Sequence, residues 1–594
     1  MPKHYGEGYQ GAFLVTEQMV ELWKELSGDS NRSIKRVLSG PMGVGKSYLA
    51  LFLAAKAYAE GWLLLYISDA KKLAADDACA IAEAICKPLL ALNKDILTID
   101  DFNRMTFWRD GQVVNIAHNI LEHLLNQLEK KTLLIIDEHG ALFGFDPLIP
   151  KRQSLLIPLM HLDAWNEERK GTRVVLTGAA HAAKFEREYI ENGMVDWLVF
   201  VTPLSSFIFD KLLNMSRILS RAVIRDKVKE ITNHVPRELV SMEKYVHEKF
   251  YEATKEALAV TRQPSTTTDI YASVTDQDIL FSLQRFRQNR RRECFAITEK
   301  CFYKDLQPTQ RHAQRCALAA MFLPRKENDT DFNYQPFDYQ FMDLGLVYRL
   351  EYGQYHPLYQ AARDALLDIY KAMPLSNDVA LAITSGNMDR LQFEAALFQQ
   401  LLRFPEVILK ATDLAGVEQT PVPIVFKHFK MLQDPPLKTS DNVLLRCYPT
   451  YPRFDFILGC MFIQTSISDF TTHNKDSADI EKAFEHSSSS RPTRSFDLRS
   501  QIEKYLDFAF GGCDLHKDGN GCHCAKIDPN SRRFIVTRDG KTVHDFRIVY
   551  IRGSPGFPNH TGKVEEFPDV LHVSFEELQD KLFGNLLIER RSGQ

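Results

Sequence analysis

The sequence has few cysteines and no long hydrophobic run. Its 594 residues include 10 Cys, too few for a disulfide scaffold, which favours a reducing compartment. No apolar stretch approaches the roughly 18–20 residues that cross a bilayer, so we expect no membrane partner. The opening residues MPKHYGEGYQGAF lack a charged segment followed by an apolar one. A conventional cleaved secretion signal is therefore not expected.

An excess of charge of one sign is also missing. There are 73 Lys and Arg residues against 77 Asp and Glu, which gives a net charge of −4. This balance excludes a protein that is basic throughout and coats nucleic acid, but it allows a local basic groove. With 45% hydrophobic and 25% charged residues, the composition is that of a globular protein. At about 150 residues per domain, the length allows about four domains.

Short strand-like runs alternate with helical patterns in the first third of the chain. The runs cover residues 34–38, 62–67, 133–136 and 174–176, and their mostly continuous hydrophobicity is typical of strands buried on both faces. Residues 47–59 are rich in Ala and Leu and predict a helix. This alternation predicts an α/β fold with a mainly parallel sheet covered by helices.

Later changes of pattern indicate domain boundaries. A purely helical pattern follows the α/β region, then a Thr- and Ser-rich connection, a second mostly helical segment, and finally a return of strand-like runs. The expected organisation is an N-terminal extension (1–33), an α/β core (34–205), a helical lid (206–260), a further helical segment (278–372) and a C-terminal α/β domain (380–594).

A phosphate-binding motif follows the first predicted strand. The pattern G-x-x-x-x-G-K-[ST] is matched in full, with a strand before it and a helix after it. Its glycines allow backbone N–H groups to point at phosphates, and the helix adds its positive end. We expect the lysine to reach the β- and γ-phosphates and the serine to bind Mg²⁺, which predicts ATP and Mg²⁺ as cofactors, with GTP left open. The predicted nucleotide-binding residues are Gly40, Pro41, Met42, Gly43, Val44, Gly45, Lys46 and Ser47.

An acidic pair ends the predicted strand 133–136. Asp137 would join the Mg²⁺ shell, and Glu138 would orient or deprotonate the attacking water. The alternative is an ordinary solvated pair at a strand end. Three further residues are candidates at the γ-phosphate, although each could equally be a cap or surface residue: His139, Thr177 and Arg237.

Three segments together resemble a known family. Residues 40–70, 133–143 and 176–193 are similar to the P-loop ATPase of the Crinkler effectors and the related retrotransposon-hot-spot proteins. Residues 343–348, 356–358 and 361–370 resemble the small winged-helix-like piece that follows such ATPases. A more distant likeness is to the mitoribosomal GTP-binding death-associated protein. The resemblance covers roughly residues 34–370 and implies an AAA-like or STAND-like ATPase that acts in a nucleus, in Crinklers that of a host cell, with a homo-oligomer as one possible state.

In these families the ATPase is commonly followed by a restriction-endonuclease-like or a kinase-like domain. The chain has no kinase signature after residue 375. Residues 454–466 instead resemble the nuclease core, which implies Asp455 as a Mg²⁺ ligand, Gln464 as a neutral oxygen ligand and DNA as the target. Glu394 matches the N-terminal helix glutamate of that fold. Ser466 stands where a lysine is usual, with His473 and Lys475 nearby.

This departure leaves three interpretations of the last third open. The site is an active nuclease with Lys475 in place of the usual lysine; it is a nuclease-like fold without strong activity; or Asp455 and Gln464 flank an ordinary core hairpin. A scaffold or a chromatin-associated protein is the corresponding alternative function.

Two weaker signals remain. The first is a dense Cys/His cluster that could hold Zn²⁺ or be a reduced loop, made of Cys513, His516, Cys522, His523 and Cys524. The second is a group of arginines that suits phosphate backbones or a nuclear import receptor, or else is a solvated helix face. Its members are Arg285, Arg287, Arg290, Arg291 and Arg292.

Overall fold

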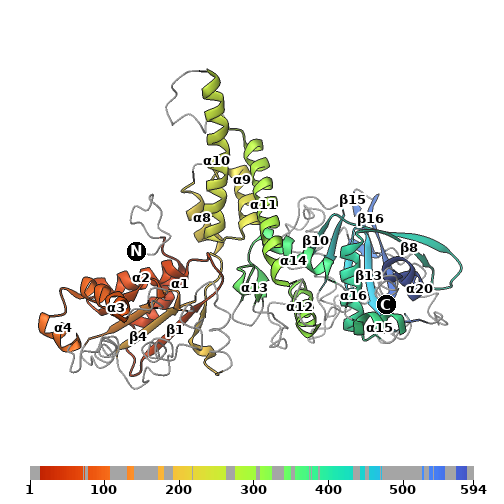
Figure 1. Cartoon of the computed structure of the whole chain (residues 1–594). Coiled ribbons are helices and arrows are strands. Elements are labelled where there is room, and N and C mark those ends of the chain that lie inside the picture. Colours follow the sequence, from red (N-terminus) through yellow and green to blue (C-terminus); the bar gives the residue numbers. More distant parts are fainter. Residues whose placement is uncertain are drawn as a thin grey trace. The chain divides into compact units, whose positions relative to one another are not determined.

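The computed structural model describes most of the chain in two compact units. Unit 1 comprises Met1–Leu306 with Phe337–Leu366, and unit 2 comprises Gln307–Pro336 with Leu367–Gln594 (Figure 1). The described residues are 14–70, 73, 78–106, 130–139, 171–178, 192–216, 218–261, 274–302, 308–323, 340–349, 355–373, 375, 377–385, 388–431, 442–447, 454–468, 470, 525–527, 534–538, 541–555 and 570–584. No helix among them is long and apolar enough to span a bilayer.

A five-stranded parallel sheet is the centre of unit 1, as the sequence predicts. Its strands are β1 (Ile34–Ser39), β2 (Leu63–Ile67), β3 (Thr132–Ile136), β4 (Thr172–Thr177) and β5 (Leu198–Phe200), in the order β2-β3-β4-β1-β5. Because β4 lies between β1 and β3, the carboxyl ends of these three strands meet at one edge. This is the α/β P-loop fold, and the prediction of fold class is confirmed.

Helices cover this sheet. The helices of the core are α1 (Glu17–Ser27), α2 (Lys46–Ala59), α3 (Ala78–Asn93) and α4 (Ile99–Thr106). Helix α2 packs against β2, β3 and β4, and α1 packs on α2. The strands are buried nearly throughout, which explains their continuous apolar runs.

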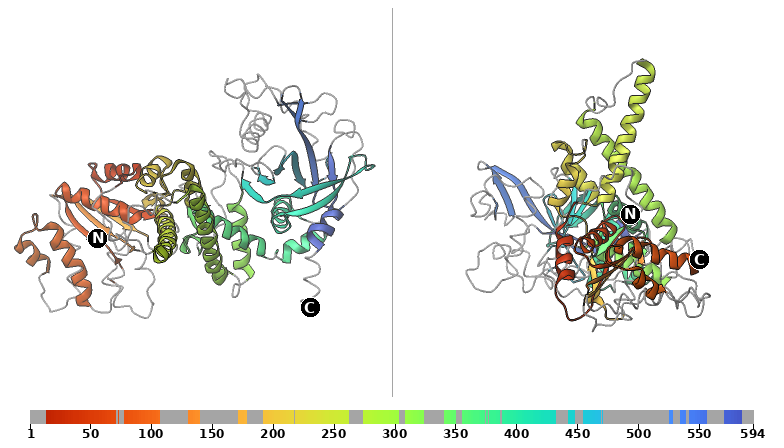
Figure 2. Two further views of the ribbon diagram at one scale, coloured as in Figure 1. Left: turned by 90° about the horizontal axis from the view of Figure 1, so that it is seen from above. Right: turned by 90° about the vertical axis from the view of Figure 1, so that its left-hand side faces the viewer.

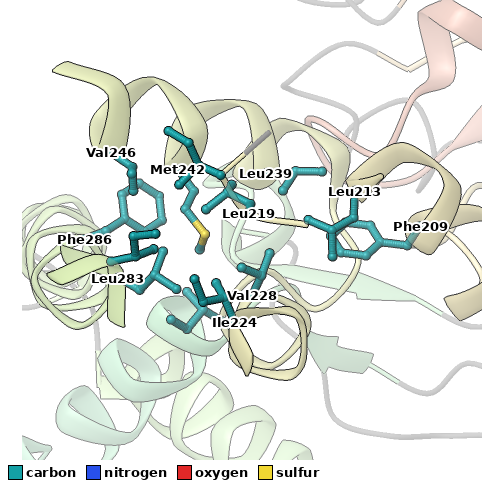
Figure 3. Close-up of a cluster of buried hydrophobic side chains, with 13 residues drawn as sticks. Phe209, Leu213, Leu219, Ile224, Val228, Leu239, Met242, Val246, Leu283 and Phe286 are labelled. Atoms are coloured by element: carbon teal, nitrogen blue, oxygen red, sulfur yellow. The ribbon is translucent and has the colours of Figure 1, made fainter. Parts of the chain in front are cut away.

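In the structure the lid takes in the helix at 276–302 as well as the expected residues 206–260, and its described elements are all helices. It contains α8 (Ser206–Leu213), α9 (Ala222–Thr232), α10 (Pro236–Thr261) and α11 (Asp276–Phe302), of which α10 and α11 lie side by side (Figures 1 and 2). Apolar side chains from all four helices form one buried cluster that includes Phe209, Val228, Met242 and Leu283 (Figure 3). This shared core makes the lid a single packed element rather than a loose string of helices.

A short hairpin lies between two helices in the last described part of unit 1. Helix α13 (Gln340–Asp343) precedes the antiparallel pair β6 (Val347–Arg349) and β7 (Tyr355–Pro357), and α14 (Gln360–Ala372) follows. The division of the chain differs from the expected segment 278–372, because residues 307–336 and 367–372 belong to unit 2.

Unit 2 is built on a mixed sheet. Its main path is β10-β11-β12-β13-β16-β17-β8-β9, and β14 and β15 extend from β16. The pairs β11–β12 and β12–β13 are antiparallel, whereas β13–β16 and β16–β17 are parallel. The strands are β8 (Glu406–Thr412), β9 (Gln419–Val425), β10 (His428–Met431), β11 (Val443–Arg446), β12 (Phe456–Leu458), β13 (Met461–Ser466), β14 (Ala525–Ile527), β15 (Phe534–Arg538), β16 (Lys541–Arg552) and β17 (Leu571–Val573).

Four helices of the described residues accompany this sheet, and α14 enters unit 2 at Leu367. They are α12 (Pro308–Met321), α15 (Asn377–Ser385), α16 (Arg390–Arg403) and α20 (Phe575–Leu578), the last continued by a π-helix at Gln579–Phe583. The helix predicted to carry Glu394 is α16, and the return of strand-like runs predicted in the last third includes β11, β12 and β13. The β8–β9 hairpin was not predicted.

Candidate nucleotide site

The phosphate-binding loop joins β1 to α2 in a conformation that only glycines adopt easily. Gly40 and Gly43 have φ angles of +139° and +97°, a region in which a β-carbon is strained. A β-carbon on Gly40 would lie 2.5 Å from the carbonyl oxygen of Val201, and one on Gly43 would lie 2.6 Å from Cβ of Arg237. Both glycines therefore allow close packing as well as the turn.

Lys46 is the first residue of α2, and its side chain turns back over the loop. Its ammonium group donates to the carbonyl oxygens of Gly40 at 2.6 Å and Pro41 at 2.8 Å. The side chain is mostly buried. The ammonium and the N-terminus of the 14-residue helix thus present positive charge on the loop. This arrangement suits the phosphates of a nucleotide.

Asp137 follows β3 and receives hydrogen bonds from three elements. The Ser47 hydroxyl of α2 donates to its Oδ1 at 3.2 Å, the Thr177 hydroxyl of β4 donates to the same atom, and the Glu138 backbone N–H lies at 3.0 Å. Only 3% of Asp137 is exposed. Burial raises the pKa of Asp137, and the hydrogen bonds from Thr177 and Ser47 oppose that rise.

These oxygens fit a Mg²⁺ ion. A carboxylate and a hydroxyl oxygen are ligands that Mg²⁺ prefers in proteins, usually together with substrate phosphates and water. A divalent cation would also compensate the buried charge of Asp137. Ser47 and Asp137 are therefore the residues that would hold the ion. The predicted metal-binding pair is brought together as the sequence suggested.

Glu138 has an unusual backbone conformation that Thr177 supports. Its φ angle is +57°, which is uncommon for a residue other than glycine and marks local strain. The backbone N–H donates to the Thr177 hydroxyl at 2.9 Å. The side chain is half-buried, and the following residue, His139, is completely buried. Thr177 thus holds the backbone that carries the candidate water-activating carboxylate.

Arg237 comes from the lid and contacts the loop directly. Its backbone N–H donates to the carbonyl oxygen of Gly43 at 3.3 Å, and its side chain packs over that glycine. Burial lowers its pKa, and neighbouring Glu238 opposes this effect. The sequence suggested that Arg237 could reach back to the nucleotide, and the structure places it at the phosphate-binding loop.

Two contacts of the site were not anticipated. Tyr66 of β2 pairs in register with Ile135, on the face of the sheet that also carries Asp137. Burial, and then the charge of Asp137, raise the pKa of its hydroxyl. The second contact comes from the hairpin segment, where a β-carbon on Gly345 would lie 3.8 Å from Cβ of Met42. Tyr66 lies near the end of a predicted strand, a position that could have identified it.

The arginine group on α11 divides into two sets. Arg287 donates to the Asp364 carboxylate at 2.7 and 2.8 Å, and Arg290 binds Glu238 at 2.6 and 3.2 Å. These two arginines hold α11 to α14 and α10. The exposed set consists of Arg285, Arg291 and Arg292.

The C-terminal candidates are buried in unit 2. Glu394 of α16, Asp455 beside β12, and Gln464 and Ser466 of β13 are all 5% exposed or less. Glu394 and Asp455 interact electrostatically. Within the part of the chain that the structure describes, no group of three or more His, Cys, Asp or Glu side chains could hold a metal ion. His473, Lys475 and the Cys/His cluster at 513–524 lie outside the described residues.

Part of the chain is similar to a known protein family, and its structure is distantly similar to solved structures. The family model of mitochondrial ribosomal death-associated protein 3 matches residues 13–105, the stretch that contains the phosphate-binding loop. The ADP form of the Aeropyrum pernix ORC2 protein is similar at 16% identity and a TM-score of 0.32, covering 62% of this chain and 96% of that chain. CDC6p from Pyrobaculum aerophilum is similar at 14% identity and a TM-score of 0.26, covering 59% and 93%. No curated protein sequence matches the chain.

Proposed function

We propose that this protein is a Mg²⁺-dependent ATPase whose nucleotide state is transmitted to its helical lid. The observation that carries the proposal is the convergence of Ser47, Asp137 and Thr177 from three elements beside the phosphate-binding loop. The match to a death-associated protein family over this stretch supports nucleotide binding.

Each residue of the site has a specific role in this proposal. Lys46 and the loop N–H groups bind the phosphates, and Ser47 and Asp137 hold Mg²⁺. The ion, when bound, neutralises charge on the β- and γ-phosphates. Glu138 orients the attacking water and accepts its proton. Arg237 lies against Gly43 and makes the lid sensitive to what the loop binds.

Two substitutions test the ATPase proposal. Lys46→Ala removes the phosphate-binding ammonium, so both nucleotide binding and hydrolysis should be lost. Glu138→Gln preserves shape but not basicity, so binding should persist while phosphate release falls. Nucleotide affinity and steady-state phosphate release would be measured on the full chain. Equal hydrolysis by both variants and the parent would refute the proposal.

The finer proposal follows from the resemblance to Crinkler effectors. In it, the ATPase controls a restriction-endonuclease-like domain in unit 2 that engages DNA in a nucleus. The proximity of Glu394 and Asp455 within unit 2 supports this choice. The alternative is a nucleotide-dependent scaffold or chromatin-associated protein with an inactive nuclease fold. Plasmid nicking with Mg²⁺, measured for the parent and for Asp455→Ala, separates an active nuclease from this alternative.

A further inference from the structure

A buried group of charged side chains lies where α16 meets the sheet of unit 2. Glu394, Arg446 and Asp455 are 4%, 3% and 5% exposed. Removing such charges from water is costly unless each is paired or hydrogen-bonded. The contacts of each charged side chain therefore indicate whether the site can hold a metal ion.

Arg446 of β11 is the partner of Glu394. Its Nη2 donates to Oε1 of Glu394 at 3.2 Å, and its Nη1 donates to the carbonyl oxygen of Phe322 at 3.4 Å. The guanidinium group also lies over the Phe398 ring, 4.1 Å from its centre. These contacts, from α16 and from the residue that follows α12, hold the positively charged guanidinium group beside Glu394.

The oxygens of Asp455 are also occupied. Its Oδ2 accepts hydrogen bonds from the backbone N–H and the hydroxyl of Thr465, at 2.6 and 2.7 Å. Its Oδ1 lies 3.9 Å from Nη2 of Arg390. Mg²⁺ demands oxygen ligands in nearly octahedral geometry, and no third His, Cys, Asp or Glu side chain among the described residues joins these two carboxylates in a group that could hold a metal ion.

We infer that Arg446 is a built-in counter-charge that takes the place of a divalent cation in the C-terminal site. This inference rests on the proposed nuclease-like character of unit 2. The single positive charge of Arg446 at Glu394 replaces the ion expected at Asp455. The site then holds no metal, so the domain binds its target without cleaving it.

The experiment uses Mn²⁺ as the probe, detected by electron paramagnetic resonance. The full chain carries Asp137→Asn, which removes the metal ligand of the nucleotide site. We expect the same amount of bound Mn²⁺ with and without an added Asp455→Asn substitution. Loss of one bound Mn²⁺ on adding Asp455→Asn would overturn the inference, whether or not the protein hydrolyses ATP.

Arg446→Met provides the complementary test. It keeps the length and packing over Phe398 but removes the charge, so Glu394 and Asp455 should gain affinity for Mn²⁺. The gain should disappear in Arg446→Met combined with Asp455→Asn. A folded Arg446→Met variant that gains no Mn²⁺ would contradict the role of Arg446. If Arg446→Met fails to fold, the amounts of Mn²⁺ bound with and without Asp455→Asn still decide whether the C-terminal site holds a metal ion.

Discussion

The hydroxyl of Thr177 donates a hydrogen bond to the carboxylate of Asp137, and it accepts one from the backbone N–H of Glu138 at 2.9 Å. One side chain therefore supports both acidic residues of the nucleotide site. This contact is possible because β4 lies between β3 and the strand that leads into the phosphate-binding loop.

Replacing Thr177 by Val should reduce hydrolysis more than binding. The buried Asp137 loses a donor and the Glu138 N–H loses an acceptor, each worth about 1–3 kcal/mol. We expect a fall in kcat of about 10- to 100-fold with a smaller change in ATP affinity. Thr177→Ser is the matched control, since it keeps the hydroxyl. Similar kcat values for the two variants would contradict this role.

Gly43→Ala should weaken the contact between the loop and the lid. A β-carbon would lie 2.6 Å from Cβ of Arg237, and the φ angle of +97° is strained for alanine. Gly45 is the control, because its φ is +109° but no heavy atom lies within 4 Å of its β-carbon position. Strain alone should cost about 1–2 kcal/mol at Gly45, and more at Gly43. Urea unfolding of unit 1 in both variants measures the difference.

The local motifs of unit 1 could be predicted from the sequence because each depends on neighbouring residues. The loop, the buried strands and the acidic pair at 137–138 all have the expected positions. The contact of Arg237 with Gly43 could only be suggested, because it depends on how the lid packs. The arginines of α11 posed the same problem, since composition does not tell which helix face is buried.

The β8–β9 hairpin was missed for a different reason. Pro421 and Pro423 in β9 argue against a strand, since proline cannot donate to a sheet. However, β9 is at the end of the strand order, where β8 is its only neighbour among the described strands. The alternating burial of β8 and its register with β9 are typical of an antiparallel pair at a sheet edge. Edge position, which the sequence does not display, made the prolines acceptable.

Arg290→Gln should destabilise the lid strongly. It would leave Glu238, which is 4% exposed at its side chain, without its bidentate partner. Removing one member of a buried ion pair costs about 3–5 kcal/mol. Denaturant unfolding would measure the loss, with Arg291→Gln as the exposed control. A loss below about 1 kcal/mol for Arg290→Gln would show that the pair is not needed.

Asp455 should make the stability of unit 2 depend on pH. Burial and the charge of Glu394 raise its pKa to about 7, so the folded state favours the protonated acid. Stability is then highest at low pH and decreases as pH rises from about 4 through 7. Asp455→Asn should remove this decrease and stabilise the protein by about 2–4 kcal/mol at pH 8. Thermal unfolding of the parent and of Asp455→Asn at pH 5 and pH 8 would measure this stabilisation. An equal stabilisation at both pH values would contradict the raised pKa of Asp455.

If the exposed arginines of α11 contact phosphate backbones, as their spacing in the sequence suggests, they should contribute to the salt dependence of DNA binding. Replacing Arg285, Arg291 and Arg292 by Gln removes three exposed charges. Each phosphate contact contributes about 0.9 to the slope of log K against log salt, so the slope should fall by up to about 2.7. Arg287→Gln is the control, since Arg287 is engaged with Asp364. An unchanged slope in the triple variant would assign the DNA contact to another surface, whereas salt-independent binding by the parent would refute a phosphate contact altogether.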